Sequence, residues 1–414
     1  MAKVLVYQLY PIAWEREGGL RAMTQHLEVI SYLGADYVWL SPLYPSPRCD
    51  HGYDIADYTA IDPRFGTMED FDEFVRVAHG LGIGVLMDLV LNHTSTEHPW
   101  FSKNPNYYCL TDSETKSKYH WQNLFDGSED VWELNRNLTE VPQGYYYLHL
   151  FHKNQADLNW FPWHDNHQLR YEPNPNLVKE FRKIVKFWTD EHKVDGFRLD
   201  APQALNKDLE KFNMEFSDLI FGSRAAEVIN AIFPDEDSPL LIMECFDPSY
   251  GGLTKFYSEN THVDFVMNVL VKDVFAEGQE ELEKVIDASC SNANFMLDLE
   301  SHDSPRFTSR GMTPEGAIWT LFCSDAEGIC LYQGQELGLD NPTKRELPDE
   351  KMLELDARTA MQAAKGQSLD KLRPYSRANA RIPLPLEEYR LQPSSQNYYL
   401  ELTKTWIKRW KSKR

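Results

Sequence analysis

Basic residues are in short supply in this chain. Its 414 residues include 42 lysines and arginines against 64 aspartates and glutamates, which gives a formal net charge of −22 at pH 7. Because nucleic acids and anionic lipid surfaces attract positive charge, this balance argues against either of them as a partner. A salt-adapted protein would also be acidic, but we favour the simpler interpretation of an ordinary acidic cytosolic surface.

Disulfide and metal-ligand spacings are also missing. The six cysteines are scattered, and none forms the CxxC pair of a zinc or redox site. No apolar run is long enough to span a bilayer. The stretch MAKVLVYQLYP (1–11) leads directly into a strand and lacks the apolar region and cleavage site of a signal peptide. We therefore expect a cytoplasmic protein with free thiols, no membrane contact, no metal and no cofactor.

The sequence is rich in short apolar segments that alternate with amphipathic helices. Eight segments read as buried strands: 3–9, 37–40, 84–89, 194–199, 239–243, 263–269, 294–299 and 328–331. Strands that alternate with helices predict a parallel sheet, and eight of them fit a closed (β/α)8 TIM barrel of the α/β class. The alternative, an open dinucleotide-binding sheet, would need a glycine-rich phosphate turn after an early strand, and none is present.

The alternation breaks off between residues 94 and 175. This segment is rich in Trp, Tyr, Asn and Asp, and it is too long for a plain loop in a compact domain. We interpret 94–175 as a small inserted domain, with 1–93 and 176–414 forming the barrel. The expected helices cover 20–33, 68–81 (capped by Thr67), 177–192, 207–219, 280–288, 313–323 and 398–411.

Polar residues gather at the ends of four of the expected strands. They are Asp88, Asn92, His93, Arg198, Asp200, Glu244, His302 and Asp303. Because the carboxyl ends of all strands of a (β/α)8 barrel meet at one face, these residues would surround a single pocket. In an extended strand Arg198 and Asp200 point to the same side, so we expect the guanidinium to keep this carboxylate ionised.

Three carboxylates in one pocket indicate glycoside chemistry. A retaining glycosidase needs a carboxylate nucleophile and a carboxylic acid that donates a proton, roughly 5 to 5.5 Å apart. Asp200 suits the nucleophile, and Glu244 suits the acid because it follows the apolar run 240–243. Asp303 suits the stabilisation of developing positive charge.

The strand ends resemble, in the same order, the four signature stretches of the α-amylase superfamily, glycoside hydrolase family 13. The matching stretches are DLVLNH (88–93), GFRLDA (196–201), ME (243–244) and SHD (301–303). The inserted segment resembles the domain B of that family. The resemblance implies that Asp200 is the nucleophile, Glu244 the acid/base and Asp303 the transition-state stabiliser.

Further stretches resemble the branch of exo-acting α-glucosidases and oligo-1,6-glucosidases. They are HGYDIADY (51–58), NHTSTEHPWF (92–101), QADLN (155–159) and NARIP (379–383). In that branch, an Asp and an Arg at the positions of Asp50 and Arg381 grip the terminal glucose and close the pocket at one end. The resemblance thus implies exo action on a small carbohydrate. As an alternative, Asp50 and Arg381 both lie in expected loops and could form a surface ion pair.

The same resemblance assigns Arg198, His93 and His302 to the sugar at subsite −1. Tyr53 lies near the expected gripping residues and suits stacking on a sugar ring, although it could also be plain packing. The aromatic pair 100–101 fits either a sugar platform or the core of the inserted domain.

Three features depart from the branch. AWEREGGL (13–20) stands where the branch usually carries a calcium loop and has too few oxygen ligands, so we expect no metal there. Residue 201 is Ala, which points to tolerance of α-1,4 linkages, whereas QADLN resembles the α-1,6 signature QPDLN. The chain also ends at what looks like the eighth barrel helix, so the family's C-terminal β-sandwich looks absent.

The main expectation is a retaining exo-acting α-glucosidase, and two other classes stay open. The same triad would serve a transglucosylase, a trehalose synthase-like isomerase or a sucrose phosphorylase-like enzyme, because the acceptor decides the outcome. A non-catalytic scaffold fits less well, since the chain keeps all three carboxylates and shows no membrane anchor.

Overall fold

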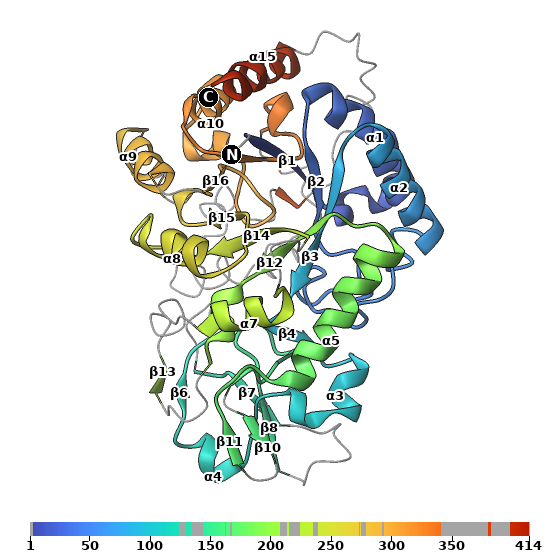
Figure 1. Ribbon diagram of the computed structural model, residues 1–414, viewed down its shortest axis with the longest axis vertical. Helices are drawn as coiled ribbons and strands as arrows, with labels where there is room; N and C mark the ends of the chain where they lie inside the picture. Colours follow the sequence, from blue (N-terminus) through green and yellow to red (C-terminus); the bar gives the residue numbers. More distant parts are fainter. Residues whose placement is uncertain are drawn as a thin grey trace.

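The computed structural model describes residues 3–123, 129–134, 144–161, 163–165, 168–207, 213–214, 224–234, 239–272, 274, 279–291, 294–340, 380–381 and 398–413. Its centre is a sheet of eight parallel strands (Figure 1). They are β1 (Val4–Leu9), β2 (Tyr37–Leu40), β3 (Gly84–Val90), β12 (Gly196–Asp200), β14 (Leu240–Cys245), β15 (Phe265–Asn268), β16 (Met296–Asp298) and β17 (Gly328–Tyr332). Each lies within two residues of the predicted bounds.

The sheet closes on itself. Strand pairing follows the chain order from β1 to β15, and β17 pairs in parallel with both β16 and β1. An isolated parallel bridge between Val266 and Phe295 joins β15 to the residue before β16. This closure confirms the predicted (β/α)8 barrel, in which the carboxyl ends of all strands open on one face.

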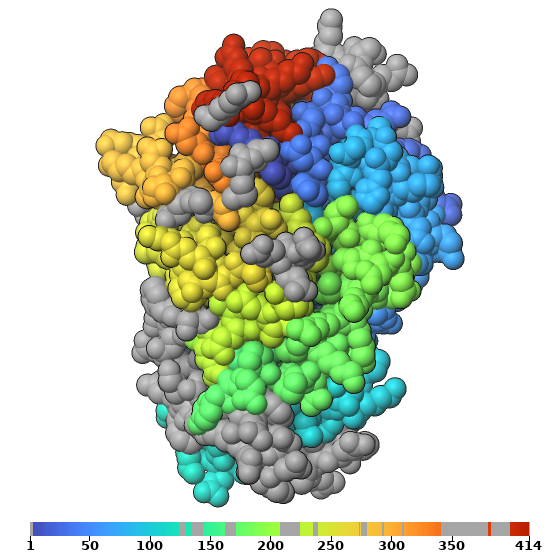
Figure 2. All heavy atoms as spheres, viewed as in Figure 1, coloured from blue at the N-terminus to red at the C-terminus, as the bar shows by residue number. Residues whose placement is uncertain are grey.

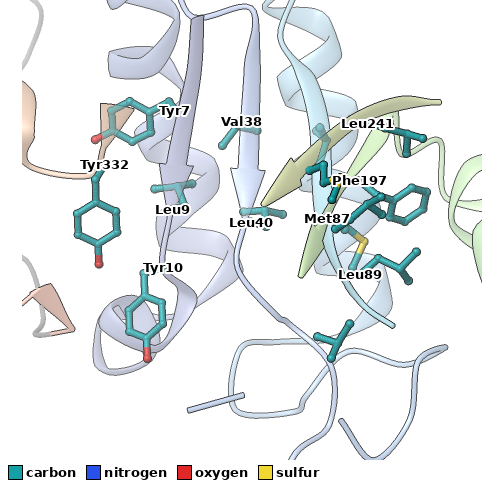
Figure 3. Close-up of a cluster of buried hydrophobic side chains, with 14 of the residues drawn as sticks. Tyr7, Leu9, Tyr10, Val38, Leu40, Met87, Leu89, Phe197, Leu241 and Tyr332 are labelled. Atoms are coloured by element: carbon teal, nitrogen blue, oxygen red, sulfur yellow. The ribbon is translucent and has the colours of Figure 1, made fainter. Parts of the chain in front are cut away.

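Side chains of the barrel strands alternate between two hydrophobic layers. Figure 3 shows part of the outer layer, where side chains from β1, β2, β3, β12 and β14 cluster beneath the helices. The inner layer fills the barrel and consists of Val6, Trp39, Leu86, Ile242, Phe265, Met267, Met296 and Cys330. Because both faces are buried, the strands are apolar almost throughout, which made them readable from the sequence. One step nearer the carboxyl ends, the inward positions become polar.

Helices cover the outside of the barrel. They are α1 (Leu20–Leu33), α2 (Met68–Gly80), α5 (Pro175–Lys186), α7 (Arg224–Ile232), α8 (Gly252–Asn260), α9 (Gln279–Cys290), α10 (Pro314–Cys323) and α15 (Tyr398–Ser412). The predicted cap of α2 is confirmed, because Thr67 and Asp70 form a capping box. Figure 2 shows one helix-covered face, with α15 at one end and α5 and α7 across the middle. In the described part of the chain, no helix is both long and apolar enough to cross a membrane.

Shorter helical segments join these elements. They are η1 (Pro11–Glu17), η2 (Pro105–Tyr107), η4 (Pro202–Leu205), η6 (Phe307–Arg310), η7 (Gln335–Leu337) and the π-helical turn η3 (Phe187–Glu191) that extends α5.

The helix expected over 207–219 is wrong where the structure describes it. Backbone pairing places β13 (Asn213–Met214) in parallel beside β6 (His120–Trp121), so a contact with the distant insertion outweighs local helix propensity. Residues 208–212 and 215–219 of the expected helix lie outside the described part. The helices α7 and α8 were not predicted.

Between β3 and α5 the chain leaves the barrel and forms small elements at the end opposite α15 (Figure 1). They are β4 (His93–Ser95), α3 (Pro99–Lys103), β5 (Leu110–Thr111), α4 (Ser113–Lys116), β6, β7 (Trp132–Leu134), β8 (Tyr146–Leu148), β9 (Gln155–Asp157), β10 (Trp163–Asp165) and β11 (Gln168–Arg170). A separate hydrophobic cluster built around Trp121 and Trp132 gives this segment a core of its own. We propose that 94–175 is a domain B, and this separate core supports that division.

Candidate active site

Arg198 is the centre of a buried ionic cluster at the carboxyl end of the barrel. Its Nη1 donates to Asp88 Oδ1 at 2.9 Å and to Asp200 Oδ1 at 2.6 Å. Its Nη2 lies 2.8 Å from Glu244 Oε2. The three carboxylates come from the adjacent strands β3, β12 and β14, so the closed sheet brings together residues that are far apart in sequence. The predicted pairing of Arg198 with Asp200 on one strand face is confirmed.

The cluster has more acidic than basic groups. When all groups are ionised, three carboxylates and one guanidinium leave a surplus of two negative charges. Burial raises the pKa of Asp88 to about 6, with Arg198 opposing the shift. Burial also raises the pKa of Asp200 well above its usual value, again against Arg198 and with the help of Glu244. Such a site tends to retain a shared proton near neutral pH.

This result corrects the expectation that Arg198 simply keeps Asp200 ionised, because burial acts in the opposite direction. Asp200 must be ionised to act as a nucleophile, so a proton shared within the cluster has to lie on one of its neighbours. One carboxyl group must be protonated to act as the acid while its neighbour is ionised to act as the nucleophile.

Glu244 is held by a second donor, the backbone of Ala201. Ala201 N donates to Glu244 Oε2 at 2.9 Å. Ala201 has φ of 38° and ψ of 46°, a left-handed conformation that is strained for a residue with a Cβ. This turn directly after Asp200 aims the amide at the next strand. The two carboxylates are therefore fixed within the span of one guanidinium group.

Tyr53 lies flat against His302. Their ring centroids are 5.3 Å apart, with an angle of 9° between the planes. The Tyr53 hydroxyl donates to Asp88 Oδ2 at 3.0 Å and lies 2.6 Å from His302 Nε2. One face of Tyr53 is therefore occupied by His302, and stacking on a sugar stays a prediction for the rest of the ring.

His302 is a neutral imidazole with a defined tautomer. Gln8 Nε2 lies 2.8 Å from His302 Nδ1, and because an amide NH2 group only donates, Nδ1 is the acceptor and Nε2 carries the proton. Burial lowers the pKa of His302 to about 4, so the ring is uncharged at neutral pH.

Asp303 lies beside His302 and is partly open to solvent. Its Oδ2 is 3.0 Å from His302 Nε2, and its side chain is 36% exposed. Arg381 Nη2 donates to Asp303 Oδ1 at 2.6 Å, while Arg381 Nε donates to the backbone oxygen of His302 at 2.7 Å. The structure therefore brings Arg381, from a distant part of the chain, to the third carboxylate.

Asp50 and Arg381 are both buried, which excludes the alternative of a surface ion pair. Asp50 Oδ2 accepts a hydrogen bond from Gln155 Nε2 of the insertion at 2.9 Å. Burial disfavours the charge of Arg381, but Tyr10, Asp303 and Asp50 more than offset it and raise the pKa of this guanidinium. Arg381 thus lies within electrostatic reach of both acidic side chains.

Comparisons with known proteins agree with this geometry. A family model described as the α-amylase catalytic domain matches residues 9–239. The trehalose-6-phosphate hydrolase of Escherichia coli (strain K12) is 32% identical over 435 residues, which cover 92% of this chain and 74% of that protein. This chain belongs to the α-amylase family. It is accordingly a glycoside hydrolase of that family.

Two further comparisons place this α-amylase family member. The oligo-1,6-glucosidase of Parageobacillus thermoglucosidasius is 39% identical over 219 residues, which cover 50% of this chain and 35% of that protein. The crystal structure of the trehalose-6-phosphate hydrolase of Bacillus licheniformis matches with a TM-score of 0.80 at 27% identity, over 99% of this chain and 83% of that chain.

In this α-amylase family member, His93 is buried where the barrel meets the insertion. Asn92 Nδ2 lies 3.0 Å from His93 Nδ1 and donates to Asp157 Oδ1 at 2.7 Å. Lys207 Nζ donates to Asn92 Oδ1, which turns the amide NH2 group toward the ring. Burial lowers the pKa of His93 to about 4, so the ring is neutral and its proton is on Nε2. A hydrogen bond with the Tyr53 backbone acts on this pKa in the opposite direction to burial.

The sequence interpretation did not single out Lys207. The available signal was a lone lysine seven residues after Asp200, directly after the uncharged stretch 201–206. At the beginning of the helix expected over 207–219 a lysine looks like an exposed residue, and only the fold shows that it is buried.

The aromatic pair 100–101 contributes to packing rather than to the site. Phe101 contacts Tyr108 and Tyr147 edge to face, with centroid distances of 5.2 and 5.1 Å. Trp100 packs against Tyr58 and Phe181, with centroid distances of 5.9 and 5.8 Å. The alternative of a sugar platform is therefore not favoured.

The stretch 13–20 forms most of η1 and the beginning of α1. Glu15 Oε2 is engaged by Arg48 Nη1 at 2.6 Å. Across the described ranges no group of three or more His, Cys, Asp or Glu residues is placed to hold a metal ion. The absence of a metal at 13–20 stays a prediction.

Proposed function

We propose that this member of the α-amylase family is a retaining exo-acting α-glucosidase that releases α-glucose from the non-reducing ends of short α-glucosides. The observation that carries the proposal is that Arg198 forms ion pairs with both Asp200 and Glu244. It supports a nucleophile and an acid/base held at one anomeric centre. Relatives named oligo-1,6-glucosidase and trehalose-6-phosphate hydrolase support hydrolysis of a glucoside.

In the proposed mechanism Asp200 attacks the anomeric carbon while Glu244 protonates the leaving oxygen. The glycosidic bond breaks as the bond to Asp200 forms. Glu244, now ionised, then takes a proton from water, and the water oxygen attacks the anomeric carbon and displaces Asp200. Two inversions at this carbon return glucose in the α configuration. Asp303 would stabilise the positive charge of both transition states.

The binding residues are proposed to act as follows. His302 and His93 are neutral rings at neutral pH. The Nε2 atom of His93 suits donation to a sugar hydroxyl, whereas that of His302 lies beside Tyr53 and Asp303 and would help to orient them. Asp50 and Arg381 would grip the terminal glucose, and their burial supports a pocket that is closed at that end. A closed end admits only the terminus of a sugar chain, which accounts for exo action.

NMR analysis of the first product tests this proposal. The purified chain is offered maltose, isomaltose, trehalose, trehalose 6-phosphate and sucrose separately, with and without phosphate. Free α-glucose as the first product supports a retaining hydrolase, and the order of rates decides between α-1,4 and α-1,6 linkages. β-Glucose would contradict retention. A new disaccharide or glucose 1-phosphate would favour the transglucosylase, isomerase or phosphorylase alternative.

We also propose a cytoplasmic location. All six cysteines are free in the structure, which is consistent with a reducing compartment. Cell fractionation with an antibody against the chain tests this proposal, and recovery of the protein outside the cytoplasm would contradict it.

A further inference from the structure

A buried lysine beneath Asp303 has no role in the glycoside chemistry described above. Lys272 lies just after β15 and is 4% exposed. Its Nζ donates to Asp298 Oδ2 at 2.7 Å and to Ser301 Oγ at 3.0 Å. Asp303 N donates to the same Ser301 Oγ at 3.1 Å. A single hydroxyl oxygen therefore connects the Lys272 ammonium to the backbone of the third carboxylate.

The ammonium has its countercharge inside the barrel. Asp298 ends β16 and stands in register with Cys330, a member of the inner hydrophobic layer. Asp298 and Lys272 are both buried, and an ammonium in such surroundings requires a paired anion to remain charged. The pair is neutral as a whole, so it supplies directed hydrogen bonds without adding net charge below the pocket.

Ser301 also closes the turn that presents Asp303. Ser301 N donates to Ser304 Oγ at 3.0 Å, and Ser304 N donates to the Ser301 backbone oxygen at 3.3 Å. Within this turn, Ser301 Oγ accepts from both Asp303 N and Lys272 Nζ. A hydrogen bond from a charged donor is stronger than one between neutral groups, so the ammonium dominates in fixing this oxygen.

We propose that Lys272 and Ser301 are positioning residues for Asp303. The Lys272 ammonium holds the Ser301 hydroxyl oxygen, and this oxygen holds the Asp303 amide, so that the carboxylate keeps its place at the mouth of the pocket. The inference rests on the proposed function, because it assumes that Asp303 stabilises the transition state. Substrate in its ground state carries little of the charge that Asp303 would stabilise, so misplacing Asp303 affects kcat more than KM.

Two variants and two controls test the proposal. Ser301→Ala removes the shared acceptor, and the double variant Lys272→Met with Asp298→Asn removes the ammonium without leaving an unpaired buried carboxylate. Ser301→Thr keeps the hydroxyl and serves as the conservative variant. Ser324→Ala is the matched control, because this buried serine donates to the Leu321 backbone oxygen at the end of α10.

Steady-state kinetics on the best α-glucoside of the wild type are corrected for the folded fraction, measured by urea unfolding. We expect Ser301→Ala and the double variant each to lower kcat by about 10- to 100-fold with KM within about twofold, as for a misplaced catalytic group. Ser301→Thr should recover most of kcat, and Ser324→Ala should match the wild type.

The proposal would be overturned if Ser301→Ala or the double variant folds and keeps the kcat of the wild type. It would also be overturned if Ser301→Thr folds but is as slow as Ser301→Ala. If a variant does not fold, the remaining variant decides by the same criterion. A wild type that turns over none of the α-glucosides would instead refute the proposed function, so the two failures are distinguishable.

Discussion

The raised pKa of Asp88 predicts that its contribution to the free energy of unfolding falls as the pH rises. An ordinary salt-bridged aspartate has the opposite effect. The carboxyl group has a pKa of about 6 in the folded chain, against 3.8 as its ordinary value. A folded pKa above the unfolded value contributes stability that is fully present below pH 3.8 and is lost as the pH rises through 6. The full contribution is about 3 kcal/mol, and about 2 kcal/mol of it is lost between pH 4.5 and 7.5.

The measurement is the free energy of unfolding of the wild type and of Asp88→Asn, by reversible urea denaturation at pH 4.5 and 7.5. Taking the difference between the two proteins at each pH cancels the titration of groups that do not interact with Asp88. We expect the wild type to lose about 2 kcal/mol relative to Asp88→Asn on going to the higher pH. No relative change, or a relative gain, would refute the reasoning, because Arg198 would then outweigh burial.

Two other aspartates provide controls whose expected signs differ. Asp157 is buried and its pKa is raised to about 6, so Asp157→Asn should show the same direction of change. Asp70 is half-buried at the beginning of α2, and its hydrogen bond from Arg21 lowers its pKa. A lowered folded pKa contributes stability that is lost as the pH falls, so Asp70→Asn should show the opposite sign.

Further predictions concern the roles of individual side chains. Asp200→Asn should lower kcat by on the order of 10⁴-fold or more without loss of stability, and near-normal turnover in a pure sample would contradict its role as nucleophile. With an activated substrate and azide, Asp200→Gly should yield β-glucosyl azide and Glu244→Ala should yield α-glucosyl azide, as NMR would show; the reverse pattern would exchange the two roles. Tyr53→Phe should cost about 1 to 3 kcal/mol in urea unfolding, because a buried carboxylate oxygen loses a donor. Lys207→Met should also cost about 1 to 3 kcal/mol in urea unfolding, since it leaves the buried amide oxygen of Asn92 without its cation. KM should rise in this variant if His93 binds the sugar. Unchanged stability would show that the contact is dispensable.

The barrel and the family could be predicted because their signals are local. A strand buried on both faces is apolar along its length, and all eight strands were recognisable for that reason. The signature stretches place Arg198, Asp200 and Glu244 at strand ends, and parallel closure then forces these ends to one face. The roles assigned to these residues remain proposals.

The tertiary structure alone decided the features that depend on contacts distant in sequence. Lys207 stood at the beginning of an expected helix, and nothing in the sequence marked Lys272 as buried. Residues 213–214 were expected to be helical, but pairing with the insertion places them in a strand. The effect of burial on Asp200 was also missed, because Arg198 was visible beside Asp200 in the sequence whereas the burial of Asp200 was not. Local patterns reveal which face of a strand is apolar, but desolvation and long-range hydrogen bonds exist only once the chain has folded around a side chain.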